Sequence, residues 1–184
     1  METKLQIISG KYRGKKLRIP ESARPTQNRA RLAIFNILQS YLTADGQYII
    51  WDSFAGSGAM GLEFISRFGA SRAIFTDIDP LSIKAIKVNT ENIKDCEIEV
   101  MQKNALDLRI SPENLQLFVF IDPPYSTPEL GQELVDKLGK TTPDGTIIVW
   151  ETENLGKTTQ IGSKFTIIRE AIYGRAKFLI LYKK

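Results

Sequence analysis

Hydrophobic and polar positions alternate with two different periods along the middle of the chain. Short apolar runs, typical of buried strands, are separated by segments in which apolar residues recur every three or four positions, as on one face of a helix. The pattern predicts strands at 48–51, 73–75, 97–101, 117–121 and 146–150. Between them it predicts helices near 59–68, 80–94 and 128–139. This repeated order predicts an α/β fold with a doubly wound, mostly parallel sheet.

The two ends of the chain break this order. Residues 5–8 and 16–19 predict two short strands around a basic, glycine-containing turn, and a helix is predicted over 27–42. Its expected buried face consists of Ala30, Ala33, Ile34, Ile37 and Tyr41. The runs 165–169 and 178–181 are β-like, and we expect them to finish the sheet as an antiparallel pair. We therefore expect one domain, with 1–42 as a small basic extension and 43–184 as the core.

The composition is that of an ordinary globular domain, with 42% hydrophobic and 25% charged residues. No apolar run approaches the roughly 20 residues of a membrane span, and the first residues lack the apolar centre of a secretory signal. The chain has one cysteine, Cys96, and no histidine. These counts exclude an internal disulfide, Ser-His-Asp and Cys-His catalysis, and metal sites built from histidine or several cysteines. We expect a soluble cytoplasmic protein whose chemistry needs no metal.

Positive charge is concentrated at the amino terminus. Residues 1–31 contain nine Lys or Arg and two Glu, a balance of +7, whereas the rest of the chain has a balance of −3. A basic segment on a mildly acidic body is expected where a protein meets a polyanion, because Lys and Arg neutralise phosphates. The alternative is a merely solvated charged face. Interruption of the charges by Gly10, Tyr12, Gly14 and Leu17 favours a structured, hairpin-like contact region.

A glycine-rich loop follows the first strand of the core. Gly56, Gly58 and Gly61 form the pattern G-x-G-x-x-G, in which the missing side chains allow a tight turn and close approach of a ligand. Asp77 and Asp79 follow at the end of the next strand, where a carboxylate accepts the ribose hydroxyls of an adenosine-containing ligand. The loop therefore predicts a nucleotide-type cofactor. The alternative is a strand-to-helix turn that binds nothing.

Asp52, at the start of this loop, helps to choose between cofactors. A pyrophosphate such as that of NAD would be repelled by the adjacent carboxylate. S-adenosyl-L-methionine (AdoMet) instead offers an ammonium and a sulfonium, and a cation beside a carboxylate is the favourable pairing. We therefore expect AdoMet rather than NAD.

A second motif, Asp122-Pro123-Pro124-Tyr125, follows the apolar run 117–121. Ligands of open α/β sheets bind beyond the carboxyl ends of the strands, so this tetrapeptide is expected to face the glycine loop. The prolines fix the chain and lack N–H donors, which leaves the Asp122 carboxylate and neighbouring carbonyls as acceptors. Acceptors beside the aromatic Tyr125 suit a flipped or unpaired nucleobase that carries an amino group. The alternative is a rigid turn after a buried strand.

The tetrapeptide, together with the loop sequence Phe-Ala-Gly-Ser-Gly at 54–58, resembles the motifs of class I methyltransferases that act on amino groups. The match is closer still to the RsmD family, which methylates a guanine N2 in bacterial small-subunit (16S) ribosomal RNA. The resemblance covers nearly the whole chain. The segment 10–17 and the Arg24-Pro25-Thr26 sequence are similar to the amino-terminal region of that family.

The resemblance implies a Rossmann-like class I methyltransferase fold, AdoMet as cofactor, and a catalytic tetrapeptide Asp122, Pro123, Pro124 and Tyr125. The cofactor contacts that the motifs and the resemblance imply are Asp52, Phe54, Ala55, Gly56, Gly58, Gly61, Asp77, Ile78, Asp79, Asn104, Ala105 and Asp122. The RNA contacts that the charge pattern and the resemblance imply are Lys11, Arg13, Lys15, Lys16, Arg24, Thr26, Arg29 and Arg31.

The implied reaction is methyl transfer from AdoMet to the exocyclic N2 amino group of a guanine in ribosomal RNA, either naked or in an assembling small subunit, by a monomeric enzyme. Three alternatives remain open. A DNA adenine-N6 or cytosine-N4 methyltransferase would usually need a larger recognition region. An NAD-dependent oxidoreductase would leave Asp52 and the tetrapeptide 122–125 unexplained. A non-enzymatic RNA-binding module would explain the basic segment but neither motif.

Overall fold

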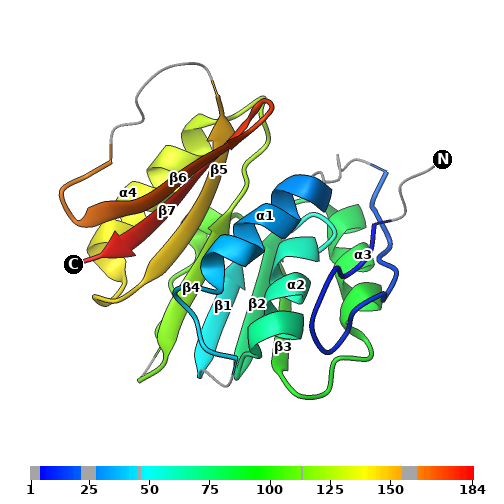
Figure 1. Ribbon diagram of the computed structural model, residues 1–184. Coiled ribbons are helices and arrows are strands. Elements are labelled where there is room, and N and C mark those ends of the chain that lie inside the picture. Colours follow the sequence, from blue (N-terminus) through cyan, green and yellow to red (C-terminus); the bar gives the residue numbers. More distant parts are fainter. Residues whose placement is uncertain (1–4, 22–27, 45–46, 113, 155–160) are drawn as a thin grey trace.

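A single sheet forms the centre of the computed structural model, which describes residues 5–21, 28–44, 47–112, 114–154 and 161–184. The strand order is β3-β2-β1-β4-β5-β7-β6 (Figure 1). The parallel strands are β1 (Tyr48–Asp52), β2 (Arg72–Asp77), β3 (Glu97–Gln102), β4 (Gln116–Ile121) and β5 (Ile147–Glu153). The last two strands, β6 (Phe165–Tyr173) and β7 (Ala176–Lys183), form an antiparallel pair beside β5. The predicted fold class is confirmed.

Helices cover both faces of the sheet. On one face lie α1 (Asn28–Leu38), α2 (Ala59–Phe68) and α3 (Pro80–Thr90), and on the other lie α4 (Glu129–Thr141) and the short 3-10 helix η1 (Ala105–Asp107) (Figure 1). Successive side chains of a strand point to opposite faces, so Ile50 packs under α1 and α2 whereas Trp51 packs under the α4 layer. Burial on both faces explains why the central strands β1, β4 and β5 appear in the sequence as continuous apolar runs.

The amino-terminal segment forms a short, irregular version of the hairpin that the sequence predicts. Gln6 and Lys16 form an antiparallel bridge. Backbone hydrogen bonds of 2.9 to 3.0 Å join residues 5–7 to residues 14–17 on either side of this bridge. Other backbone N–H groups of this segment find acceptors on α2, since the Lys11 N–H donates to the Ser66 carbonyl at 2.7 Å and the Tyr12 N–H donates to Ser66 Oγ at 2.9 Å. The helix thus satisfies backbone donors of the turn between the two arms of the hairpin. The basic region is therefore docked on the core.

The buried face of α1 also differs from the prediction. Arg31, Phe35 and Leu38 are fully buried, whereas Tyr41, which the apolar spacing assigns to the buried face, is exposed and lies beyond the end of the helix. The large apolar side chains Phe35 and Leu38 determine which face of the helix is turned towards the core. Arg31 lies on that face and is therefore buried. The described chain contains no helix long and apolar enough to cross a membrane.

Glu63 of α2 provides the charge that Arg31 needs. It is fully buried, and its carboxylate accepts hydrogen bonds from the backbone N–H groups of Ile8 at 2.7 Å and Ser9 at 3.1 Å. Arg67 Nε donates to the same carboxylate at 2.7 Å, and Arg31 Nε lies 3.9 Å from it. One carboxylate thus joins the amino-terminal segment, α1 and α2. Burial lowers the pKa of Arg31, although the charge of Glu63 opposes this shift.

We predict that Glu63→Gln lowers the free energy of unfolding by about 3 kcal/mol, because breaking a buried ion pair leaves an uncompensated charge inside the protein. Urea unfolding of the variant measures this loss, and Glu133→Gln on the exposed surface of α4 is the matched control. A loss no larger than that of the control would contradict a structural role for Glu63.

Candidate active site

The two sequence motifs meet at the carboxyl ends of β1 and β4. These strands are parallel neighbours in which Asp52 is paired with Phe120, so the glycine loop and the tetrapeptide 122–125 leave the sheet side by side. Ser53 connects them directly, since both its backbone N–H and its Oγ donate to the Phe120 carbonyl, at 3.1 and 2.6 Å. The strand order also reverses here, because β2 and β4 flank β1 on opposite sides. Open α/β sheets bind ligands at such a point.

A short chain of buried hydrogen bonds ties the glycine loop to β2 as well. Trp51 Nε1 donates to Thr76 Oγ1 at 2.9 Å, and Thr76 Oγ1 donates to the Ser53 carbonyl at 2.9 Å. Both Thr76 and Ser53 are buried, so these bonds are shielded from competing water. The start of the loop is therefore held to three strands before any ligand binds.

Asp52 lies underneath the loop and is only 3% exposed. Its carboxylate accepts a hydrogen bond from the N–H of Gly61, the third residue of α2, at 2.9 Å. Gly58 at the N-cap offers no side chain, and Asp52 satisfies one of the free N–H groups of the helix in its place. The close packing depends on glycine, since a Cβ at Gly61 would come within 2.4 Å of the Phe75 ring.

Burial raises the pKa of Asp52 to about 7, and the nearby charge of Asp77 adds to this rise, whereas the Gly61 hydrogen bond opposes it. The carboxylate occupies the N-terminus of α2, which is where dinucleotide-binding folds hold a pyrophosphate. A cationic ligand group near the loop would favour the ionised carboxylate, and an anionic one would oppose it.

Asp77 and Asp79 have different local roles. Asp77 accepts the Gly56 N–H at 2.8 Å and the Asp79 N–H at 2.9 Å, one on each carboxylate oxygen. Each of these oxygens has a second lone pair for a ligand hydroxyl. Asp79 is the N-cap of α3 and accepts the Leu81 N–H at 3.0 Å. Between them, Ile78 is 67% exposed and offers an apolar surface beside the carboxylate of Asp77.

The other expected cofactor residues surround the same edge of the sheet. Phe54 is half-buried and Ala55 is buried in the loop, where the Ala55 N–H donates to the Thr76 carbonyl at 2.9 Å. Asn104 caps η1 by accepting the Leu106 N–H at 3.0 Å, and Ala105 is buried. Asn104 therefore lies beyond β3, at the end of the sheet where β1 and β2 also finish.

The tetrapeptide begins one residue beyond β4. Asp122 is half-buried, Pro123 is buried, and Pro124 and Tyr125 are exposed. The Pro124 carbonyl accepts the Thr127 N–H at 2.9 Å, so the turn uses one of the carbonyls that the sequence suggests for a ligand. Burial and the carboxylate of Glu151 raise the pKa of the Tyr125 phenol, and the nearby charge of Asp122 adds to this rise.

Sequence analysis misses Glu151 and Asn89. Glu151 follows the apolar part of β5, is 8% exposed, and accepts a hydrogen bond from the Tyr125 hydroxyl at 3.0 Å. Its signal in the sequence is a charged residue directly after a buried run. Asn89 of α3 is buried and binds both the N–H and the carbonyl of Arg18, at 2.8 and 2.9 Å, while also donating to the Ser57 carbonyl at 2.8 Å. It joins the basic segment to the glycine loop.

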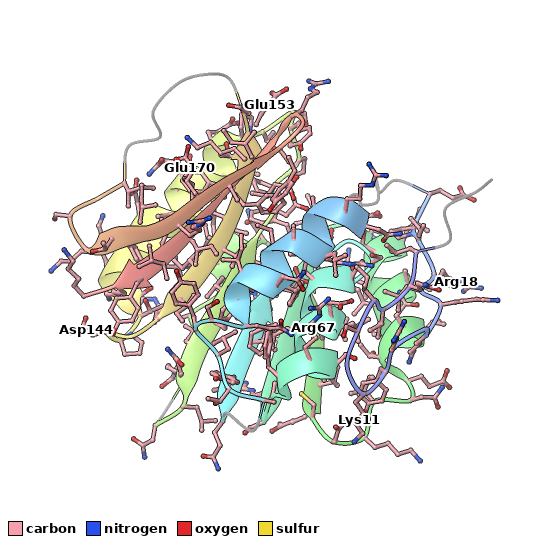
Figure 2. All side chains as sticks on the ribbon, viewed as in Figure 1. Lys11, Arg18, Arg67, Asp144, Glu153 and Glu170 are labelled. Atoms are coloured by element: carbon pink, nitrogen blue, oxygen red, sulfur yellow. The ribbon has the colours of Figure 1, made fainter. Side chains whose placement is uncertain are left out.

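The expected RNA-contacting cations fall into different environments. Arg13, Lys16 and Arg29 are exposed. Lys11 forms an ion pair of 2.8 Å with Asp95, and this hydrogen bond raises the pKa of Lys11. Figure 2 shows Lys11 and Arg18 on the side of the molecule away from Glu153 and Glu170 of the β5–β7 region.

Two expected RNA contacts are not supported by their surroundings. Arg31 is fully buried against Glu63, so the expectation that its side chain contacts RNA is wrong. The Lys15 ammonium is buried without a hydrogen-bond partner in the described residues, and burial lowers its pKa. Arg24 and Thr26 lie outside the described residues.

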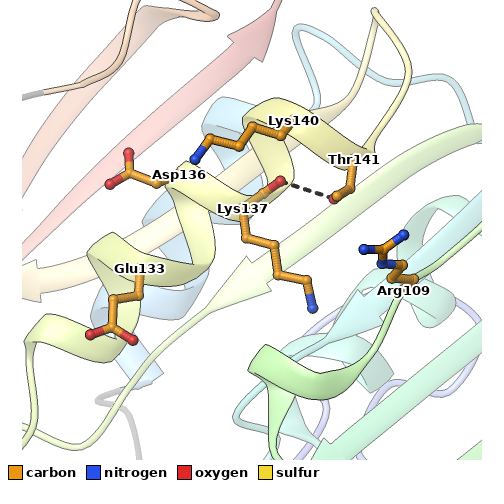
Figure 3. A pocket seen from close by; sticks show the side chains of 6 residues that line it. All are labelled: Arg109, Glu133, Asp136, Lys137, Lys140 and Thr141. Carbon is orange, nitrogen blue, oxygen red and sulfur yellow. Dashed lines mark hydrogen bonds between the residues drawn. The ribbon is translucent and has the colours of Figure 1, made fainter.

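A separate open cavity of about 620 Å³ lies against α4 (Figure 3). Its lining residues are Arg109, Glu133, Asp136, Lys137, Lys140 and Thr141. Lys137 donates to the carbonyls of Leu106 and Leu108, so this cation connects α4 to the segment around η1. The cavity contains none of the residues of the two motifs. Within the described ranges, no cluster of three or more acidic, Cys or His residues is arranged to hold a metal.

We predict that Asp52 makes the stability of the protein depend on pH. Its pKa rises from 3.8 to about 7 on folding, so between these values the folded state retains a proton that the unfolded state has released. Stability is therefore lost as the pH rises, by on the order of 4 kcal/mol across this interval, of which about 3 kcal/mol is lost above pH 5. Urea unfolding at about pH 5 and about pH 8 should show this fall in the wild type and its absence in Asp52→Asn. Asp144→Asn, at an exposed site, is the control, and a wild-type fall retained in Asp52→Asn would contradict the assignment.

Comparison with known proteins places this arrangement in a family. The sequence model of a family described as Conserved hypothetical protein 95 matches residues 5–182. Ribosomal RNA small subunit methyltransferase D of Escherichia coli (strain K12) is 30% identical over 184 residues, covering 98% of this chain and 90% of that protein. The protein of the same name from Haemophilus influenzae is 35% identical over 127 residues, covering 66% of this chain and 64% of its own.

Solved structures agree with this relationship. The structure of yhhF from Escherichia coli superimposes with a TM-score of 0.82 at 28% identity and covers 98% of each chain. The rRNA methyltransferase aviRa from Streptomyces viridochromogenes has a TM-score of 0.66 at 12% identity, over 89% of this chain and 88% of its own, which is a likeness of fold alone. The expected class I methyltransferase fold is confirmed. The chain belongs to the RsmD family, whose sequence model is the one described as Conserved hypothetical protein 95.

Proposed function

We propose that this protein transfers a methyl group from AdoMet to the exocyclic N2 amino group of a guanine in small-subunit ribosomal RNA. The observation that carries the proposal is the side-by-side exit of the glycine loop from β1 and of Asp122 from β4. This brings a cofactor loop and a base-binding tetrapeptide to one edge of the sheet. The names of the relatives support ribosomal RNA as the substrate. The guanine N2 atom is the more specific part of the proposal.

The residues around the loop fit AdoMet. Asp77 has acceptor positions left for the two ribose hydroxyls, and the exposed Ile78 can pack on the adenine ring. Asp52 supplies a carboxylate near the loop, which favours the cationic methionine part of AdoMet over a pyrophosphate. Bound there, AdoMet supplies an activated methyl group on a sulfonium.

The task of the tetrapeptide is to present the amino group. A guanine N2 lone pair is delocalised into the ring and is a poor nucleophile. Asp122 accepts hydrogen bonds from the amino hydrogens and turns the nitrogen towards the methyl group, and such orientation is worth roughly 7–11 kcal/mol. Tyr125 holds the base by stacking, worth roughly 1–3 kcal/mol. The methylated nitrogen is strongly acidic and loses its proton afterwards to solvent, so this step requires no histidine.

The exposed cations of the amino-terminal segment and of α1 are proposed to hold the RNA backbone. Arg13, Lys16, Arg18 and Arg29 are exposed, and guanidinium groups suit phosphate oxygens. Asn89 forms hydrogen bonds with both Arg18 and Ser57. RNA bound to the amino-terminal segment would therefore contact a region that is connected to the glycine loop through Asn89. In this proposal the protein acts as a monomer in the cytoplasm.

We predict that Asp122→Ala lowers the single-turnover rate of methyl transfer to small-subunit RNA at saturating AdoMet by at least about 10²-fold, roughly 2.7 kcal/mol of barrier. Asp122→Asn keeps one acceptor oxygen but loses the charge, and should fall between Asp122→Ala and the wild type. Tyr125→Ala should lose less than Asp122→Ala, because stacking positions the base without polarising it. Near-wild-type transfer by Asp122→Ala would remove this residue from the mechanism.

Cofactor binding separates the two acidic residues after β2. Asp77→Ala should weaken AdoMet binding by roughly 1.5–3 kcal/mol, as expected for the loss of hydrogen bonds to a charged group. Asp79→Ala should instead lower the free energy of unfolding by about 1 kcal/mol through loss of the α3 cap. Calorimetric titration with AdoMet and urea unfolding measure the two effects. Equal AdoMet affinity in Asp77→Ala and the wild type would refute the ribose assignment.

The double variant Arg13→Ala, Lys16→Ala should bind small-subunit RNA more weakly and with a shallower salt dependence. With fewer phosphate contacts, fewer counterions are released when the RNA binds. Its AdoMet affinity should hardly change. Lys140→Ala, Lys164→Ala removes the same charge from exposed positions at the other end of the sheet and is the matched control. An RNA affinity and salt slope equal to those of the control would identify the basic segment as a solvated face.

A further inference from the structure

Glu151 lies next to Asp122 because of strand register. In the parallel pair β4 and β5, Ile121 is opposite Trp150. Asp122 directly follows Ile121, and Glu151 directly follows Trp150. Neighbouring strands are about 4.8 Å apart. Two carboxylate residues therefore lie side by side near the carboxyl end of β4, the first in the tetrapeptide and the second within β5, a strand that neither sequence motif includes.

Tyr125 connects the two groups. Its hydroxyl donates to Glu151 Oε1 at 3.0 Å, while 41% of the side chain stays exposed. In the described chain this hydroxyl is the only hydrogen-bond donor to Glu151, whose second oxygen can accept another. A stacked base would therefore lie on the exposed ring of Tyr125, with Asp122 and Glu151 along one edge. Burial raises the pKa of Glu151, as expected for a carboxylate with too few donors.

The bases differ in what they would offer to two adjacent acceptors. Guanine presents the N2 amino group beside the N1–H, so two donors lie next to each other on its Watson–Crick edge. Adenine presents its N6 amino group beside the N1 lone pair, and cytosine presents its N4 amino group beside the N3 lone pair. A carboxylate facing such a lone pair is repelled and remains without a donor, which is unfavourable at a site this buried.

We propose that Glu151 is a specificity-determining residue that selects guanine by accepting its N1–H, while Asp122 accepts the N2 amino group. This inference rests on the proposed function and adds to it a residue that decides between bases. Glu151 does not act on the reacting nitrogen. It accepts a hydrogen bond from the neighbouring ring nitrogen and, through Tyr125, keeps the stacking ring in position.

The test uses small-subunit RNA with one changed nucleotide at the guanine that the wild-type protein methylates. One RNA carries guanine there and the other carries 2-aminopurine, which keeps the 2-amino group but has a lone pair instead of the N1–H. We expect the wild-type kcat/KM to be at least about 10²-fold higher for guanine. In Glu151→Gln this ratio should fall below about 10-fold, because the amide can turn its N–H₂ towards the lone pair.

Tyr125→Phe is the matched control, since it keeps the ring and the Glu151 carboxylate while removing the hydroxyl. Its absolute rate is expected to change, but its guanine preference should stay at the wild-type ratio. Retention of that ratio in Glu151→Gln, with AdoMet binding intact, would overturn the proposal.

Should Glu151→Gln fail to fold, Glu151→Asp tests the same proposal. Its side chain keeps the negative charge but is one methylene shorter, so the carboxylate lies farther from the base. It should lower kcat/KM for guanine by about 10-fold or more and leave 2-aminopurine nearly unchanged. Equal losses for both bases would overturn the proposal. Failure of the proposed function is distinct, since the wild-type protein would then transfer no methyl group to the guanine RNA at all.

Discussion

Parallel pairing of β1 with β4 is the constraint on which the active site depends. It brings together two segments that are about seventy residues apart in the sequence. The hydrogen bonds from Ser53 to the Phe120 carbonyl fix how these segments are aligned along the strand direction. Both strands are buried on both faces, so a one-residue slip would move every core side chain to the wrong layer. The hydrophobic core therefore sets the geometry of the site, and Asp52 and Asp122 take their positions from the strands that precede them.

The site is rich in acceptors, of which Asp52 and Glu151 are buried and Asp77 and Asp122 are half-buried. Asp52 and Asp77 accept hydrogen bonds from N–H groups of α2 and the glycine loop, whereas Asp122 directly follows β4 and Glu151 lies beside it on β5. Such a site favours ligands that bring donors or positive charge, which suits a sulfonium cofactor and an amino-bearing base. The exposed cations proposed to bind phosphate lie elsewhere, on the docked amino-terminal segment and on α1. Charge thus separates the surface proposed for phosphate from the pocket proposed for the base.

Much of this arrangement could be predicted from local pattern, and the rest depends on contacts between distant segments. The apolar runs of β1 and β4 and the two motifs specify the fold and the edge that carries the site. The burial of Arg31 could not be predicted, because it depends on Glu63, which lies on another helix. The role of Glu151 could not be predicted for a similar reason, since only the register of β4 against β5 brings it next to Asp122. The charge pattern and the family resemblance therefore assign Arg31 to RNA, and neither sequence motif includes Glu151.

The most direct test of the central claim is the identity of the methylated nucleoside. Small-subunit ribosomal RNA is incubated with the protein and labelled AdoMet, digested to nucleosides and analysed by mass spectrometry. The proposal predicts that the label appears in N2-methylguanosine and that Asp122→Ala abolishes most of it. Label in N6-methyladenosine or N4-methylcytidine, or no label in RNA despite bound AdoMet, would contradict it.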